Sequence, residues 1–145
     1  MNAIDLRALL ADPVQSGAYF IDDRDTAAMA QAGTALDFGV ARIDLSGCGD
    51  KTELLARLAR GLRFPSWFGG NWDALADSLG DLSWWPAPGY LLLVEQVGGL
   101  READDDTFAT LLSILNEVAE DWRERNVAFW ALLPLPADAL AALET

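Results

Sequence analysis

The side chains best placed to do chemistry in this sequence are two aspartates four residues apart, Asp73 and Asp77. On a helix, which turns by about 100° per residue, both lie almost opposite Leu75 and point away from the core. Like charges at this spacing destabilise a helix by roughly 0.2 to 0.5 kcal/mol, so helix stability does not explain the pair. Paired carboxylates can hold a hard cation such as Mg²⁺ or contact a basic partner.

A short helix and the turn before it are expected to hold this pair in place. Asn71 is a suitable N-cap, and Gly80 is expected to end the helix. Trp67 falls in the preceding turn and Trp72 at the boundary between the two helix faces. Large aromatic side chains beside charges are typical of protein interfaces, although a solvated helix face with both tryptophans in the core remains open.

The run of residues 64–80 carries a proline, paired aromatics, glycines, an asparagine and the pattern Asp-Ala-Leu-x-Asp. It resembles the central motif of the barstar family, small intracellular inhibitors of secreted ribonucleases, and the resemblance extends more weakly over residues 40–133. In that family the acidic helix and the loop before it occlude the nuclease active site. The carboxylates there take the place of RNA phosphates.

This resemblance implies a set of partner-binding residues, the last of them by a weaker match. They are Trp67, Gly69, Asn71, Trp72, Asp73, Ala76, Asp77 and Glu117. The best-studied family member has Trp at the position of Ala76 and Tyr at the position of Trp67. These departures concern the identity of the partner more than the mode of binding.

The charge of the chain favours a basic protein as partner. The net charge is −13 and the isoelectric point about 4.1, so the phosphates of nucleic acid or of an anionic membrane would be repelled. Residues 64–121 contain eleven acidic residues and one basic residue, Arg101. We expect a basic secreted ribonuclease or a related nuclease toxin as partner, with no direct contact to nucleic acid or membrane.

The reactive residue types indicate a binding protein and not an enzyme. The chain has no histidine and one cysteine, Cys48, so it lacks Ser-His and Cys-His pairs and most ligands of transition metals. We expect no cofactor and no catalysis. Two alternatives stay open: a metal-assisted enzyme that uses Asp73, Asp77 and Glu117, and an immunity-type binder of a different basic toxin nuclease.

The order of apolar patterns predicts an α/β fold in one globular domain. Strands are expected at residues 18–21, 40–45, 90–94 and 127–133, and helices at 4–11, 25–32, 50–62, 72–79, 104–122 and 137–144. Such alternation predicts a small parallel sheet sandwiched between helices, a barstar-like three-layer αβα arrangement. Residues 1–38 are expected to be an N-terminal extension packed on the same domain, and residues 39–145 the barstar-like domain.

We expect this protein in the cytoplasm. Its single cysteine excludes an internal disulfide, and residues 1–6 lack the basic region and apolar run of a signal peptide. No apolar run reaches the roughly 20 residues that cross a bilayer. The sequence does not determine an oligomeric state, and a monomer is the simplest expectation.

Overall fold

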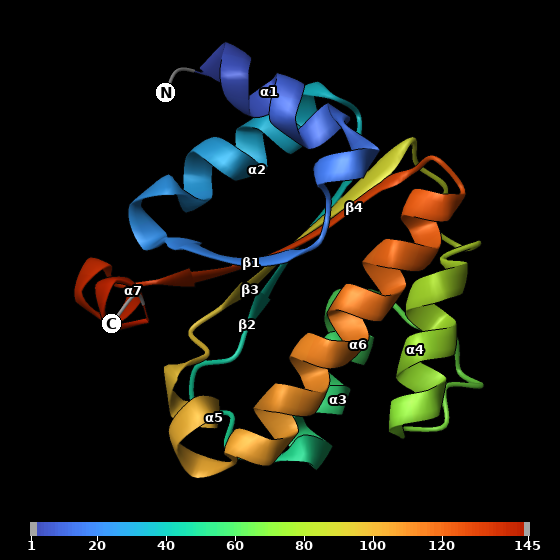
Figure 1. The fold of residues 1–145 in the computed structure, drawn as a ribbon. Helices are drawn as coiled ribbons and strands as arrows, with labels where there is room; N and C mark the ends of the chain where they lie inside the picture. Colours follow the sequence, from blue (N-terminus) through green and yellow to red (C-terminus); the bar gives the residue numbers. More distant parts are fainter. Residues whose placement is uncertain (1–2, 144–145) are drawn as a thin grey trace.

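The computed structural model describes residues 3–143, with side chains from residue 6, and is built on a four-stranded parallel sheet (Figure 1). The strand order is β1-β4-β3-β2, and every pair of neighbours is parallel. The strands are β1 (Ala18–Asp22), β2 (Gly39–Asp44), β3 (Gly89–Glu95) and β4 (Ala128–Leu135).

The two central strands, β3 and β4, are buried almost throughout. Their continuous apolar sequences are typical of strands covered on both faces. Because side chains alternate along a strand, Tyr90 and Leu92 pack into the core on one face, and Leu91 and Leu93 pack on the other. The sheet therefore needs a helical layer on each side.

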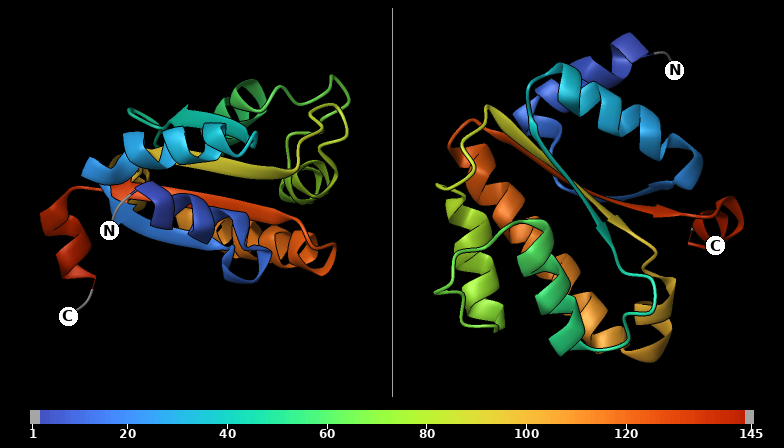
Figure 2. Two further views of the ribbon diagram at one scale, coloured as in Figure 1. Left: turned by 90° about the horizontal axis from the view of Figure 1, so that it is seen from above. Right: turned by 180° about the vertical axis from the view of Figure 1, so that it is seen from behind.

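Helices supply both layers (Figure 2). The helices are α1 (Ala3–Ala11), α2 (Thr26–Ala35), α3 (Lys51–Gly61), α4 (Trp72–Asp81), α5 (Gly98–Ala103), α6 (Asp105–Glu124) and α7 (Ala137–Ala142), with short 3₁₀ turns η1 (Pro13–Gln15) and η2 (Asp23–Asp25). Helices α1 and α2 cover one face, and α3, α4, α5 and α6 cover the other. This three-layer α/β architecture confirms the predicted fold class. Within residues 3–143, none of the helices combines the length and apolarity needed to cross a membrane.

The segment before residue 38 adds an edge strand and a complete helical layer. Strand β1 pairs with β4, and the indole Nε1 of Trp130 donates a hydrogen bond to the carbonyl of Leu10 at 2.9 Å. Arg123 of α6 also donates to the carbonyl of Ser16. The segment is thus joined to the rest through the sheet and through side chains. The division of the chain at residue 38 stays a prediction.

Two helices, α2 and α4, extend past their predicted ends through a glycine. Gly33 lies inside α2, where an added Cβ would approach Leu91 Cδ2 to 2.8 Å, so close packing on β3 explains this glycine. Helix α4 continues past Gly80 to Asp81 and ends at Leu82, which has a φ of 50°. Leu82 is fully buried, and its burial offsets the cost of a left-handed backbone for a non-glycine residue.

One further helix and two further element ends differ from the prediction. Helix α5 was not predicted, because its six residues begin with a glycine pair. Strand β4 extends to Leu135 because Pro134 remains paired with Ile21 of β1. The predicted end of the last helix, residue 144, lies outside the described residues, and α7 ends at Ala142.

Candidate protein-binding surface

Helix α4 presents its two predicted carboxylates to solvent. The side chain of Asn71 caps the helix, since its Oδ1 accepts a hydrogen bond from the backbone N–H of Ala74 at 2.8 Å. On the inner face Leu75, Ser78 and Leu79 are fully buried, whereas Asp73 and Asp77 are exposed. The predicted orientation of the pair is confirmed.

Helix α6 forms the second wall of this surface. It packs against α4, and the indole Nε1 of Trp122 donates a hydrogen bond to the carbonyl of Leu79 at 2.9 Å. Arg125 follows the end of α6, and its guanidinium lies 3.6 Å from the centroid of the Trp122 ring. The same side chain donates to the carbonyl of Gly80 at 2.8 Å. These contacts fix the spacing of the two helices at one end.

Between α4 and α6 the surface contains two hollows, which we call together the acidic groove. The first has a volume of about 450 Å³ and is lined by Trp72, Asp73, Ala76, Ala109, Thr110, Ser113, Ile114 and Glu117. The second has a volume of about 580 Å³ and is lined by Ala76, Asp77, Gly80, Asp81, Asp121, Glu124 and Arg125. Ala76 lines both hollows, so the groove passes over this residue.

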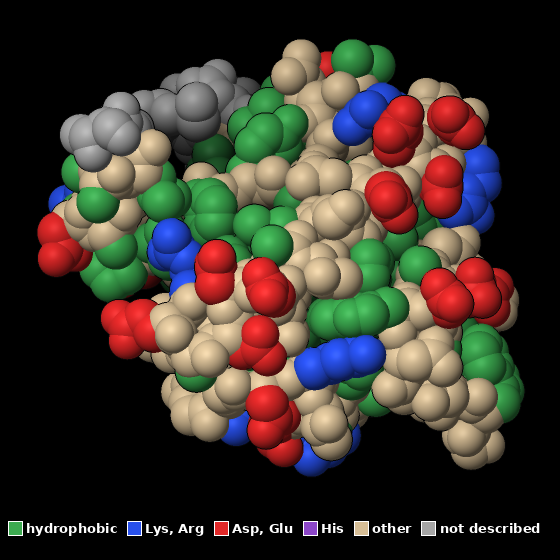
Figure 3. Space-filling view, turned by 60° about the horizontal axis from the view of Figure 1, so that its bottom comes forward, with side chains coloured by type: hydrophobic (Ala, Val, Ile, Leu, Met, Phe, Trp, Pro, Cys, Tyr) green, Lys and Arg blue, Asp and Glu red, His purple; other side chains and the backbone are tan. Residues whose placement is uncertain are grey.

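The acidic groove carries carboxylates on both walls. They are Asp73, Asp77 and Asp81 on α4, and Glu117, Asp121 and Glu124 on α6. All six residues are exposed, and none of them forms an ion pair among the described side chains. On the face seen in Figure 3, acidic side chains gather where α4 and α6 lie. Arg125 is the one basic residue lining the groove, so the field of this surface is predominantly negative.

The loop before α4 holds an exposed tryptophan. Trp67 is 60% exposed, and its ring meets the ring of Trp84 edge to face at 6.3 Å. Beneath it, Phe64 packs against Phe68 with ring centroids 4.9 Å apart. Gly70 has a φ of +68°, a conformation that favours glycine and turns the chain into α4. The loop is therefore stiffened by aromatic contacts while one large ring stays accessible.

Trp72, in the first turn of α4, is half-buried and contacts a residue from another helix. The Nζ atom of Lys51, at the start of α3, lies 5.2 Å from the centroid of its ring. This cation–π contact restrains the ring at the edge of the first hollow. The predicted position of Trp72 between the two faces of the helix is confirmed.

The structure brings most of the predicted site residues to the groove. Trp72, Asp73, Ala76 and Glu117 line the first hollow, and Asp77 lines the second. The remaining three, Trp67, Gly69 and Asn71, lie in the loop and at the cap and line neither hollow.

Sequence reasoning missed four of the lining residues that carry charge. They are Asp81, Asp121, Glu124 and Arg125. The acids of α6 follow Glu117 at intervals of four and three residues, which places them on one helix face. That spacing is visible in the sequence, but only the contact between α4 and α6 shows which face meets the partner helix.

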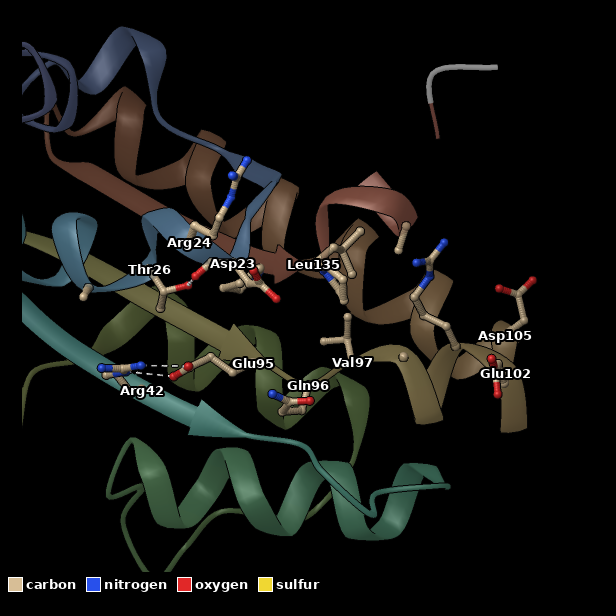
Figure 4. Close-up of a pocket in the computed structure, with 16 residues that line it drawn as sticks. Asp23, Arg24, Thr26, Arg42, Glu95, Gln96, Val97, Glu102, Asp105 and Leu135 are labelled. Atoms are coloured by element: carbon tan, nitrogen blue, oxygen red, sulfur yellow. Dashed lines mark hydrogen bonds and ion pairs between the residues drawn. The ribbon is translucent and has the colours of Figure 1, made fainter. Parts of the chain in front are cut away.

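A larger cavity, of about 790 Å³, lies at the carboxyl ends of the strands (Figure 4). None of the predicted site residues lines it. Two of its arginines are already bound, since Arg24 pairs with Asp22 and Arg42 makes two hydrogen bonds to Glu95, each of 2.8 Å. These two arginines of the cavity thus form ion pairs, whereas the carboxylates of the groove form none with the described residues.

The groove lacks a set of metal ligands. Within the described part of the chain, no group of three or more acidic, cysteine or histidine side chains is arranged to hold a metal ion. The metal-assisted alternative requires Asp73, Asp77 and Glu117 to converge, but Asp77 lines a different hollow from the other two. Cys48 is buried, and burial raises the pKa of its thiol, which disfavours the nucleophilic thiolate.

Comparisons with known proteins give a fold neighbour and a family. A chain in the structure of Drosophila ORC bound to DNA aligns with a TM-score of 0.52 and 20% identity over 94% of this chain, and the alignment covers 37% of that chain. This likeness concerns the fold alone, and the present chain spans little more than a third of that chain's length. No curated protein matches the sequence. The model of the family Barstar (barnase inhibitor) matches residues 38–134, which is most of the chain, and the protein therefore belongs to the barstar family.

Proposed function

We propose that this protein inhibits a secreted ribonuclease by binding over its active site with the acidic groove and the loop before α4. The observation that carries the proposal is the exposure of Asp73 and Asp77, without internal ion-pair partners, at the place where the family motif lies. Proteins of this family are inhibitors of ribonucleases such as barnase. The charge pattern and the family thus support the same role.

The mechanism is competitive occlusion. A ribonuclease active site must hold RNA phosphates with basic side chains, and the carboxylates of α4 offer those side chains a substitute. The field of the groove speeds the encounter and orients the partners, while desolvated carboxylate contacts slow release. Trp67 and Trp72 supply apolar contact area beside the charges. This mechanism needs no cofactor and no catalytic step by the inhibitor.

The proposal includes cytoplasmic residence and action as a monomer. A cytoplasmic inhibitor would protect the producing cell from nuclease that has not yet been exported. An immunity-type role against a different basic toxin nuclease uses the same surface, and the experiment below separates the two by the identity of the enzyme retained.

The test is inhibition of nucleic-acid cleavage by two purified panels, basic secreted ribonucleases with barnase among them and basic toxin nucleases of other kinds. We expect at least one enzyme to be retained on the immobilised protein at low salt and to lose activity in proportion to added protein. The double variant Asp73→Ala/Asp77→Ala should lose both effects.

The matched control is Glu102→Ala/Asp105→Ala, which removes the same charge at the cavity of Figure 4. This variant should inhibit like the wild type. The proposal fails if no ribonuclease is retained, or if both double variants weaken binding equally, since the effect would then reflect bulk charge.

A further inference from the structure

The cavity at the carboxyl ends of the strands lies where the chain leaves the sheet in two directions. After β1 the chain enters η2 and α2, and α2 covers one face of the sheet, whereas after β3 it enters α5 and α6, which cover the other. Strand β4 lies between these two exits, because it is the neighbour of both β1 and β3. In open α/β sheets, ligands bind in the crevice at such a place. The volume of the cavity, about 790 Å³, is also typical of small-molecule sites.

One wall of the cavity comes from the segment before residue 38. Asp23, Arg24, Thr26 and Ala27 line the cavity and precede the residues that match the family model, 38–134. The other lining residues come from the ends of β2, β3 and β4 and from the helices and turns that follow β3 and β4. Inhibition of a ribonuclease through the acidic groove uses none of them, so the proposed function gives this cavity no role.

Four charged residues that line the cavity have no ion-pair partner among the described residues. Arg24 and Arg42 are paired with carboxylates, as described above. The residues left without a partner are one cation, Arg101, and three carboxylates, Asp23, Glu102 and Asp105. A ligand that pairs with all of them must therefore carry one anionic group and an excess of positive charge.

The cation of the cavity, Arg101, is held by aromatic rings. Its guanidinium carbon lies 5.5 Å from the ring centroid of Phe20 on β1 and 5.6 Å from that of Phe108 on α6. These cation–π contacts restrain the side chain before a ligand arrives, which lowers the entropic cost of binding. Since no described carboxylate pairs with it, the planar guanidinium can bind a ligand carboxylate through two hydrogen bonds.

The unpaired carboxylates lie on two sides of the cavity. In the view of Figure 4, Asp23 lies on one side of Val97 and Leu135, and Glu102 and Asp105 lie on the other. Glu102 directly follows Arg101 in α5, so the cation and this carboxylate belong to the same wall. A ligand that reaches both sides is elongated, with a positive group at each end and an anion beside one of them. The apolar side chains between the two sides suit a methylene chain.

We propose that this cavity binds a basic α-amino acid, of the kind of lysine, ornithine or arginine. The α-carboxylate pairs with Arg101, the α-ammonium group with Glu102 or Asp105, and the side-chain cation with Asp23. A diamine would leave Arg101 without an anion, and an acidic amino acid or a phosphate ester would face three carboxylates. The inference goes beyond the proposed function and does not depend on it.

The first test is calorimetric titration of the wild-type protein with lysine, ornithine and arginine. At least one of them should bind saturably and raise the midpoint of thermal unfolding as its concentration rises. Its decarboxylated analogue (cadaverine, putrescine or agmatine) and its analogue with a neutral side chain (norleucine, norvaline or citrulline) should each bind about tenfold more weakly or less.

Two variants assign the ends of the ligand. Arg101→Gln should weaken binding of the amino acid by about tenfold or more but should not weaken binding of the decarboxylated analogue, which has no carboxylate to lose. Asp23→Asn should weaken the amino acid in the same way and leave the neutral analogue unchanged. A merely structural loss would weaken all ligands alike. Thermal unfolding verifies each fold, and Asp23→Asn, at an exposed position, carries the test if Arg101→Gln does not fold.

The matched control is Asp25→Asn. It removes an exposed carboxylate two residues after Asp23, in the same 3₁₀ turn, that does not line the cavity. This variant should bind the amino acid like the wild type. Equal losses in Asp23→Asn and Asp25→Asn would mean that the ligand responds to bulk charge, and would overturn the inference.

The remaining outcomes separate this inference from the proposed function. Absence of saturable binding by all three amino acids, or binding of both analogues at the strength of the amino acid, would overturn the inference and leave inhibition standing. The double variant Asp73→Ala/Asp77→Ala should bind the amino acid like the wild type, because neither residue lines the cavity. Failure to inhibit any nuclease would therefore overturn the proposed function and leave this site standing.

Discussion

Helices α3 and α4 follow one another in the sequence and cover the same face of the sheet, yet they use their outer charges in opposite ways. On α3 the guanidinium of Arg57 pairs with Glu53 at 2.9 Å and donates hydrogen bonds to the carbonyls of Asp44 and Ser46. On α4 neither Asp73 nor Asp77 forms an ion pair among the described residues. A charge with internal partners ties elements of the fold together, whereas a charge without them is available to another molecule.

The outer side of α3 shows that a row of basic residues is not always a solvated face. It includes Arg57, Arg60 and Arg63. Arg57 instead fastens α3 to the loop that follows β2. Asp50 caps the N–H of Glu53, but the two residues do not form a reciprocal capping box, because the Glu53 carboxylate accepts a hydrogen bond from Arg57. The number of charged residues on a helix therefore says less about function than the number of charged residues that lack an ion-pair partner within the molecule.

The largest effect on partner binding is expected from Asp77→Ala. Removing one partner of a desolvated charge contact should cost about 2 to 5 kcal/mol of binding free energy, roughly a 30-fold to several-thousand-fold rise in Kd for the ribonuclease. Because Asp77 is exposed and unpaired, the free energy of unfolding should change by less than about 0.5 kcal/mol. Calorimetric titration and urea unfolding measure the two quantities.

Arg57→Gln tests the opposite case, a charged side chain whose partners lie within the molecule. It removes contacts within the molecule, so it should lower the midpoint of thermal unfolding and leave the Kd unchanged. If Arg57→Gln weakened binding as much as Asp77→Ala, the division between structural and partner-binding charges would be wrong.

The second effect concerns the rate of association. Raising the salt concentration from about 50 mM to about 500 mM should slow binding at least about tenfold, because the field of the unpaired acids is screened, and should change the dissociation rate little. Stopped-flow fluorescence of two tryptophans, Trp67 in the loop before α4 and Trp72 in the groove, measures both rates. An association rate independent of salt would show that the acids of the groove do not steer the partner.

A smaller effect is expected from Asn71→Ala, which removes the cap of α4. The N–H of Ala74 would lose its acceptor, at a cost of about 1 kcal/mol in the free energy of unfolding. Asn71→Asp keeps an acceptor at the cap and should remain close to the wild type. Urea unfolding distinguishes the two variants, and equal losses in both would mean that Asn71 acts through something other than its capping oxygen.

The smallest effect concerns the stability of the fold at acidic pH. It involves Asp22, at the end of β1 and outside the acidic groove. Hydrogen bonds from the side chain and backbone of Arg24 lower the pKa of Asp22 from 3.8 to about 2. A depressed pKa in the folded state stabilises the protein above the unfolded pKa, and this contribution disappears as the pH falls from about 4 to about 2. In urea unfolding across this range, Asp22→Asn should lose less stability than the wild type. Parallel curves would contradict a role for the Asp22–Arg24 pair.

Local sequence patterns were sufficient to predict the strands, the long helices, and the orientation of Asp73 and Asp77. These features depend on local rules: apolar runs for buried strands, the 3.6-residue period of a helix, and an asparagine that caps the first turn. The motif of residues 64–80 also pointed to the barstar family, which the family match confirmed.

Which charges lack partners, and which residues surround Ala76, depend on packing between elements that are distant in the sequence. The second row of acids belongs to α6, some forty residues after α4 in the chain, and its register against α4 depends on contacts such as Trp122 with Leu79. Likewise Gly33 lies within a helix because α2 packs closely on β3, and Leu82 adopts a left-handed backbone because its side chain is buried. Local propensity costs or gains about 1 kcal/mol at such positions, and long-range packing outweighs it.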